Sequence, residues 1–169
     1  MTDEDSHRRT ARGTEWLTTL RRFFAFVIPA HLAWEMAQLP LYTIWYEAAP
    51  SRIAFAVVHC WAGDAIITSA TLLGALLLVS NSRWPNERFA LVALSTVLAG
   101  LAYTVFSEWN NTEVRSSWAY SSLMPTLPWI GTGLSPLLQW LVIPLAAFWW
   151  ARSGKMQTIH HAAQHNDQG

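Results

Sequence analysis

The residues best suited to chemistry lie in the first apolar stretch of the chain. His31, Glu35 and Gln38 occur there at spacings of four and then three residues. On a helix this spacing places the three side chains on one face. Ionisable groups inside a membrane helix cost about 3 kcal/mol on insertion scales, so they usually face a bundle interior and mark functional sites. These three residues, the polar stripe, are therefore the first candidates for a site.

The composition is typical of a membrane protein. Of the 169 residues, 52% are hydrophobic and only 13% are charged, which excludes an ordinary soluble domain. Four apolar stretches approach the length of about 20 residues that a spanning helix needs. They cover residues 23–46, 53–80, 89–107 and 134–150. We predict an all-α integral membrane protein whose four transmembrane helices form an antiparallel bundle.

Basic residues are distributed unevenly between the connections. The connections on one side, together with both chain ends, contain Arg8, Arg9, Arg12, Arg21, Arg22, Arg83, Arg88, Arg152 and Lys155. The other two connections contain only Arg52 and Arg115 as basic residues. The positive-inside rule then places both termini in the cytoplasm. We expect a multi-pass protein of a cell membrane, and the bacterial inner membrane suits this pattern.

Polar segments flank the predicted membrane domain, which covers residues 21–152. Residues 1–20 and 153–169 have no apolar period that could be buried, so we expect disordered or surface-lying tails. Residues 108–133 form a connection longer than a helical hairpin needs, and they are rich in aromatic residues and proline. This composition favours an ordered outer cap over a flexible linker.

Polar residues of all four helices fall in the outer half of the predicted bundle. With a rise of about 1.5 Å per residue, Glu35 lies near the midplane, and His59 and Asp64 lie below the outer boundary. The set in this half comprises His31, Glu35, Gln38, His59, Asp64, Tyr103, Glu108 and Gln139. The remaining stretches of the last three helices are nearly free of ionisable groups. This asymmetry predicts a pocket that opens outward.

Carboxyl groups in such a pocket suit acid–base catalysis, because a buried carboxyl can keep a proton and donate it to a substrate. The candidate acids and bases are His31, Glu35, Asp64 and Glu108, and the candidate ligand-binding residues are Gln38, Tyr103, Trp118 and Gln139. The sequence does not distinguish which carboxyl is the acid.

A metal centre is a second use of the same residue types. Imidazoles and carboxylates from facing helices are common ligands of first-row metals, and a divalent cation would neutralise buried carboxylates. His31 and Glu35 share a helix face, and His59 would complete a set of three ligands. His59 and Asp64, however, are five residues apart, which is about 140° around a helix. A hydrogen-bonded network that only holds the bundle together is the structural alternative.

The element His31-x-x-x-Glu35, together with the further carboxylates and tryptophans, is similar to the site of the four-helix sterol-isomerase (emopamil-binding) family. In that family a small bundle performs acid–base chemistry on a lipid. The similarity covers this short element alone, and the rest of the chain does not follow the family pattern. It is an analogy rather than a family assignment.

Three functional hypotheses follow. The first is a membrane-embedded enzyme, or a protein that binds a metal, cofactor or lipid, with a lipid or small molecule as ligand. The second is a proton- or ion-coupled transport component, which would have to form oligomers because four spans are few. The third is an accessory or assembly protein whose polar network is structural. The bilayer is the expected partner, and the basic residues lack the aromatic interleaving of a nucleic-acid surface.

Overall fold

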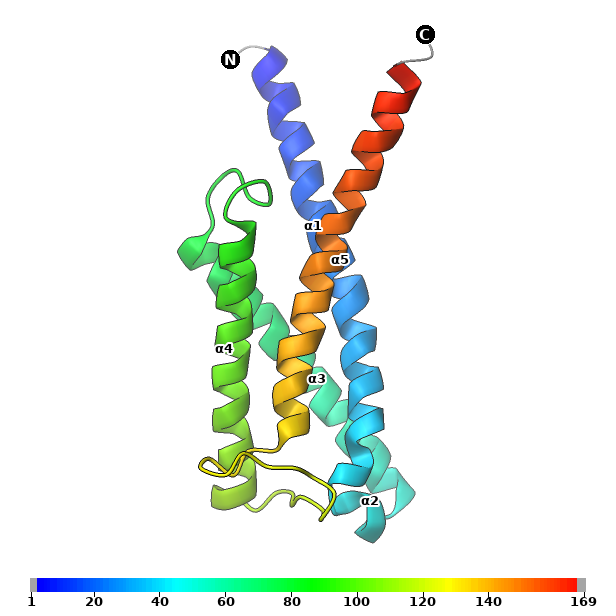
Figure 1. Cartoon of the computed structure of the whole chain (residues 1–169), viewed down its shortest axis with the longest axis vertical. Helices are drawn as coiled ribbons and strands as arrows, with labels where there is room; N and C mark the ends of the chain where they lie inside the picture. The colour runs from blue at the N-terminus through cyan, green and yellow to red at the C-terminus, as the bar shows by residue number, and fades with distance from the viewer. Residues whose placement is uncertain (1–2, 167–169) are drawn as a thin grey trace.

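The computed structural model describes residues 3–166 of the chain and the side chains of residues 14–153. Within this part the protein is helical, which confirms the predicted all-α class. Four long helices run alternately down and up in Figure 1. They are α1 (Asp3–Gln38), α3 (Pro50–Val79), α4 (Phe89–Trp109) and α5 (Leu134–Asn166).

The four long helices pack as a square. Helix α1 packs against α3 and α5, and α4 packs against the same two neighbours. The pairs α1 with α4 and α3 with α5 are therefore diagonal. Both termini and the connection between α3 and α4 lie at one end of the bundle, the terminal end, and the remaining connections lie at the other, the capped end (Figure 1).

Three helical segments are long and apolar enough to cross a membrane. They are Pro50–Val79, Phe89–Val114 and Leu134–Ser153. Apolar side chains cover their outward faces, and Leu78, for example, is 85% exposed. In a bilayer such side chains contact lipid, so their exposure fits a membrane protein. Helix α1 is not among the three, and its apolar run is interrupted by the polar stripe.

The end of α1 differs from the predicted span of residues 23–46. The α-helix stops at Gln38, and the chain continues as a short 3-10 turn, η1 (Leu39–Leu41), and one helical turn, α2 (Ile44–Glu47). Pro40 explains the difference, because proline has no backbone N–H to continue the helical hydrogen bonds and its ring would clash with the carbonyl one turn earlier. The apolar stretch continues past the proline although the helix does not.

The α-helices extend into both polar tails. Helix α1 begins at Asp3, and α5 continues to Asn166. Each packed helix supplies a nucleus for its polar extension, and once a nucleus exists each further residue adds a hydrogen bond. The polarity of these terminal segments therefore does not indicate where the helices end.

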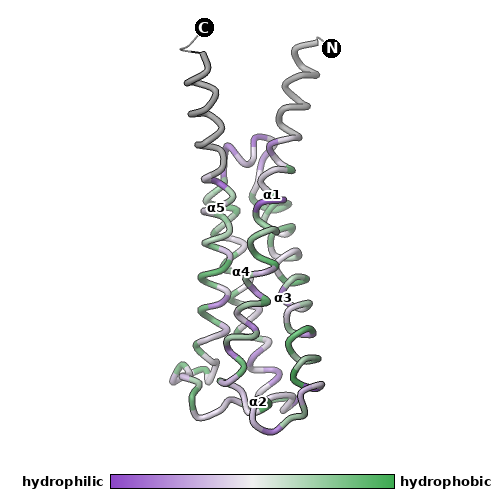
Figure 2. The backbone as a smooth tube through the Cα atoms, turned by 90° about the vertical axis from the view of Figure 1, so that its right-hand side faces the viewer, coloured by the Kyte–Doolittle hydropathy of each residue, from purple (hydrophilic) through white to green (hydrophobic). Residues whose placement is uncertain are grey.

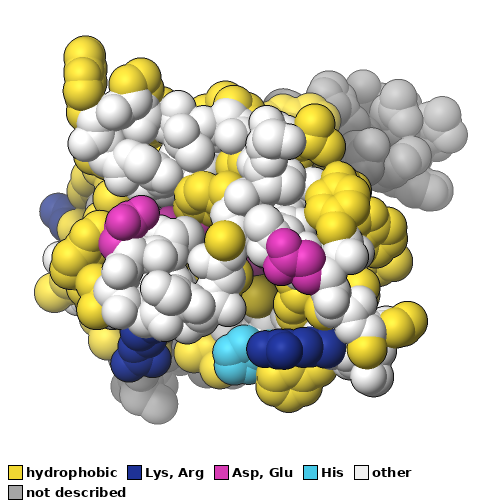
Figure 3. Space-filling view, turned by 90° about the horizontal axis from the view of Figure 1, so that it is seen from below, with side chains coloured by type: hydrophobic (Ala, Val, Ile, Leu, Met, Phe, Trp, Pro, Cys, Tyr) yellow, Lys and Arg dark blue, Asp and Glu magenta, His cyan; other side chains and the backbone are white. Residues whose placement is uncertain are grey.

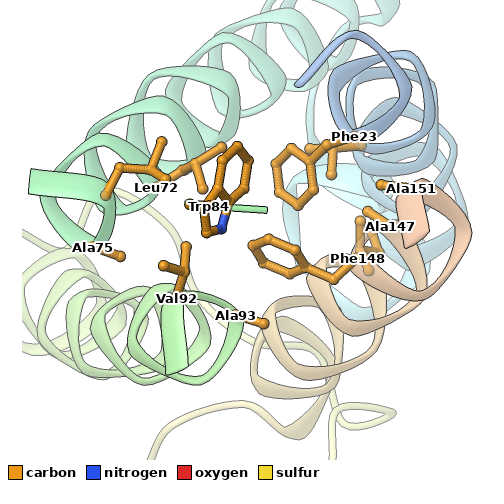
Figure 4. Close-up of a cluster of buried hydrophobic side chains, with 12 residues drawn as sticks. Phe23, Leu72, Ala75, Trp84, Val92, Ala93, Ala147, Phe148 and Ala151 are labelled. Carbon is orange, nitrogen blue, oxygen red and sulfur yellow. The ribbon is translucent and has the colours of Figure 1, made fainter. Parts of the chain in front are cut away.

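An apolar core fills the terminal half of the bundle. Phe23, Leu72, Trp84 and Phe148 converge there from three helices and the α3–α4 connection (Figure 4). The rings of Phe23 and Phe148 are 4.6 Å apart, and the Trp84 side chain is 2% exposed. Figure 2 shows apolar residues along all four helices, with polar ones concentrated at the two ends and at a few interior positions. Aromatic and aliphatic side chains thus occupy the interior of the terminal half.

A cap closes the opposite end of the bundle. Helix α4 continues as the π-helical turn η2 (Asn110–Val114), and residues 115–133 then cross the end of the bundle. The Thr43 N–H donates to Ala119 O at 3.0 Å, and the Ser121 N–H donates to Leu41 O at 2.9 Å. These hydrogen bonds attach the cap to the segment that follows α1.

Candidate functional site

A single side-chain amide is the centre of the polar site. Gln139 Nε2 on α5 lies 2.9 Å from Asp64 Oδ2 on α3 and 3.1 Å from Glu35 Oε1 on α1. The same nitrogen lies 3.0 Å from His31 Nδ1. Gln139 is 1% exposed and His31 is fully buried. An amide nitrogen has only two hydrogens, so it can donate to two of these three atoms.

The carboxylates are the stronger acceptors, so we assign both hydrogens to Glu35 and Asp64. His31 Nδ1 then carries a hydrogen directed at Asp64 Oδ2, 3.4 Å away. On the other side of the ring, His31 Nε2 lies 3.4 Å from Thr68 Oγ1, one helical turn beyond Asp64. The imidazole thus has a polar neighbour at each nitrogen, as a buried histidine requires.

A second set of hydrogen bonds fixes Gln38. Its Nε2 donates to Glu35 Oε1 at 2.9 Å, and its Oε1 accepts from Ser135 Oγ at 2.8 Å. The Trp34 indole N–H donates to Ser135 Oγ at 3.1 Å. We call the whole assembly the polar network; it consists of His31, Trp34, Glu35, Gln38, Asp64, Thr68, Ser135 and Gln139. It joins α1, α3 and α5 at one depth.

No lysine or arginine within residues 14–153 hydrogen-bonds to the polar network. Glu35 and Asp64 accept from the same amide nitrogen, which holds their carboxyl groups close together. Two carboxyl groups held this close, with no lysine or arginine beside them, repel each other when both are charged. The arrangement can therefore both give and accept a proton.

A second polar group lies beneath the cap. The Tyr120 O–H donates to Glu108 Oε2, and the Gly133 N–H donates to the Tyr120 oxygen at 3.0 Å. The Tyr42 ring lies 5.6 Å from the Tyr120 ring. Burial, followed by the hydrogen bond to Glu108, raises the pKa of Tyr120 above its ordinary value. Burial also raises the pKa of Tyr42, and the Glu108 charge adds to this effect.

A cavity of about 700 Å³ connects the two groups. Glu35, Asp64 and Gln139 lie in its wall on the side of the polar network, and Glu108 and Trp118 lie in its wall near the cap. Figure 3 shows the capped end in space-filling form, where acidic side chains and a histidine beside an arginine appear among apolar ones. The volume is sufficient for a small-molecule ligand.

The structure brings together most of the residues predicted for the site. His31, Glu35, Gln38, Asp64 and Gln139 form the centre of the polar network. The other predicted residues that line the same cavity are His59, Tyr103, Glu108 and Trp118.

His59 lies in the same cavity wall but apart from the other two members of the predicted metal set. Its side chain is exposed and stacks on Phe55 at 5.6 Å, so it does not reach His31 or Glu35. Asp64 points into the bundle, and His59, about 140° away around α3, points outward. Among the described residues, no group of three or more His, Cys, Asp or Glu side chains is arranged to hold a metal ion.

Four contributors were not predicted. Thr68 and Ser135 each lie one turn from a predicted residue on the same helix face, Thr68 after Asp64 and Ser135 before Gln139, so helical spacing could have found both. Trp34 was assigned no role, and Tyr120 lies in the irregular cap, where no periodic pattern identifies which side chains point inward.

Comparisons with protein-family models, curated proteins and solved structures found no match to this chain. The similarity of His31-x-x-x-Glu35 to the sterol-isomerase site therefore stays confined to that element, and the geometry is the basis for a functional conclusion.

Proposed function

We propose that α1, α3, α4 and α5 all cross the bilayer, with both termini in the cytoplasm and the cap outside, as in a multi-pass protein of a bacterial inner membrane. Arginines at the terminal end support this orientation. Arg22 donates to Trp150 O at 3.0 Å, and the Arg152 guanidinium lies over the Phe89 ring. Helix α1 can cross despite its polar stripe, because that stripe faces the polar network and is shielded from lipid.

We further propose that the cavity binds a small molecule or lipid and that Glu35 and Asp64 transfer a proton to or from it. The observation that carries this proposal is the convergence of two carboxyl groups on one amide donor in the cavity wall, with no lysine or arginine among the described residues bonded to them. A protonated carboxyl is the acid and its ionised neighbour is the base, which is the minimum for moving a proton within a substrate. His31 and Gln139 orient the pair.

The apolar core favours this function over the transport hypothesis. A proton or ion pathway needs polar groups or water along its full length. Phe23, Trp84 and Phe148 fill the terminal half of the bundle instead. The remaining alternative is an accessory protein with a purely structural network, and it predicts that the cavity has no dedicated ligand.

Extraction of the purified protein separates these hypotheses. Protein in lipid nanodiscs is extracted, and small molecules in defined ratio to protein are identified by mass spectrometry. We expect such a molecule with the wild type and its loss with Glu35→Gln and Asp64→Asn. Leu78→Ala, on the lipid-facing surface, is the matched control and keeps it. A wild-type protein without such a molecule, or equal amounts in all variants, would contradict the proposal.

A further inference from the structure

The cavity reaches the side of the bundle between α3 and α4. Phe55 on α3 and Tyr103 and Phe106 on α4 line the cavity and are nevertheless 69%, 45% and 56% exposed. His59 is also exposed in this wall. These residues belong to the flank of the bundle, whereas the cap covers its end. We call them the portal residues.

The course of α3 accounts for an opening at this position. Helix α3 packs against both α1 and α4, and Figure 1 shows it crossing the bundle diagonally. Its end lies beside α4 near the terminal end, and its beginning lies beside α2 near the capped end. The two helices therefore separate toward the cap, where the portal residues lie. In the proposed topology this flank faces lipid.

The chemistry of the opposite wall restricts the ligand. Glu35 and Asp64 present acceptor oxygens, and both hydrogens of the Gln139 amide are already directed at them. A ligand head that donates hydrogen bonds fits these acceptors, whereas a carboxylate or phosphate head would be repelled. The basic residues that line the cavity, Arg52 and Arg115, are both exposed and lie near the cap.

We propose that the ligand enters sideways from the outer leaflet through the portal residues, and that it is an amphiphile with an apolar body and a hydrogen-bond-donating head, either a hydroxyl or a protonated amine. This inference rests on the proposed function, because it names the substrate class of the same cavity. Aromatic side chains at the portal suit an apolar body, and they also attract a cationic head through their ring faces.

Photo-crosslinking tests the route and the class. The probes are hexadecanol, hexadecylamine and hexadecanoate, each with a diazirine in the chain, in nanodiscs that contain the wild-type protein. We expect saturable crosslinks from the alcohol or the amine to 55–59 or 103–106, and about tenfold fewer from the carboxylate. Whichever of the alcohol and amine probes crosslinks identifies the head group of the ligand. Equal labelling by all three probes, or labelling confined to α1 and α5, would overturn the proposal.

Two glycines on α3 supply a matched pair of blocking variants. A Cβ added at Gly63 or at Gly74 would meet no atom within 4 Å, so both positions accept a larger side chain. Gly63 lines the cavity, whereas Gly74 does not. Gly63→Leu should abolish saturable crosslinking at the portal, and Gly74→Leu should retain it. Retention by both variants would contradict entry into this cavity.

The outcomes distinguish this inference from the proposed function. If butylamine and butanol compete with the long-chain probes at equal free concentration, the ligand enters from water and the lateral route is wrong, although the cavity still binds it. If a small molecule is extracted from the wild type and no amphiphile crosslinks saturably, the proposed function holds and the substrate class is wrong. If no small molecule is extracted and no amphiphile crosslinks saturably, both the proposed function and this inference are wrong.

Discussion

Gln139 donates a 2.9 Å hydrogen bond to Asp64 across the centre of the bundle, although their helices, α5 and α3, are diagonally opposite. The same nitrogen also reaches Glu35 on α1, so one side chain links three helices. A carboxyl pair that lost this donor would keep only Gln38 and His31 as neighbouring donors. Gln139 is thus the residue whose removal affects the network most directly.

Gln139→Leu should lower the stability of the protein, because it keeps the approximate volume and removes a donor from two buried acceptors. The expected loss is about 1–3 kcal/mol, visible as a lower Tm in nanodiscs. Asp64→Asn in the same background provides a double-mutant cycle. Because the residues are in direct contact, we expect a coupling free energy of about 1 kcal/mol. Strictly additive effects would show that the hydrogen bond contributes no stability.

Gly100→Ala should also be destabilising, through helix packing. The indole of Trp140 lies so close to Gly100 that an added Cβ would stand 2.4 Å from Trp140 Cε3. Trp140 in turn contacts the His31 ring at 5.2 Å, so its displacement would disturb the polar network. We expect a loss of about 1–3 kcal/mol in thermal unfolding. Gly74→Ala, which meets open space, is the control, and Trp140→Phe should partly restore the stability of Gly100→Ala.

The sequence predicted the parts of the site that depend on helical periodicity. The spacing of His31, Glu35 and Gln38 is local, so it placed them on one face before any tertiary contact was known. The prediction added Asp64 and Gln139 to this group because the charge asymmetry indicated the direction of each helix and the helical rise indicated the depth of each residue. Neither step requires knowledge of side-chain packing.

The remaining parts depend on information that periodicity does not carry. Tyr120 reaches Glu108 only because the cap adopts one particular irregular path, and no repeat in residues 115–133 encodes that path. His59 had a suitable depth, but its rotation around α3 turned it away from Asp64. The helix end near Pro40 was readable in principle, because proline breaks the backbone ladder. Hydrophobicity does not indicate this helix end, because the apolar stretch continues past Pro40.

Substitution of His31 should lower the stability of the protein much more than substitution of His59. His31→Ala removes a fully buried ring that contacts Asp64, Thr68 and Gln139, and we expect a loss of about 2–4 kcal/mol. His59→Ala removes an exposed ring stacked on Phe55 and should change the stability by less than about 0.5 kcal/mol. Thermal unfolding in the same nanodiscs measures both. Equal losses would mean that His59 belongs to the network after all.

Tyr120→Phe should detach the cap from α4, because it removes the donor to Glu108 and the acceptor for the Gly133 N–H. Hydrogen exchange of residues 115–133 should become faster, whereas exchange in the α3 segment of the apolar core should not change. Tyr46→Phe, at an exposed tyrosine outside the cap, is the matched control. Unchanged exchange in the cap would show that this contact does not hold it.

The same variant should alter the response to alkaline pH. Burial and the hydrogen bond to Glu108 raise the pKa of Tyr120 in the folded protein above the ordinary value of about 10. The unfolded chain therefore releases this proton at lower pH than the folded protein does. The resulting stability is complete below about pH 10 and is lost as the pH rises toward the folded pKa.

Unfolding in detergent at increasing pH should show this decline in the wild type. Tyr120→Phe should make this decline smaller without abolishing it, because the pKa of Tyr42 is also raised in the folded protein. An identical decline in both proteins would mean that Tyr120 titrates no differently in the folded and unfolded chain.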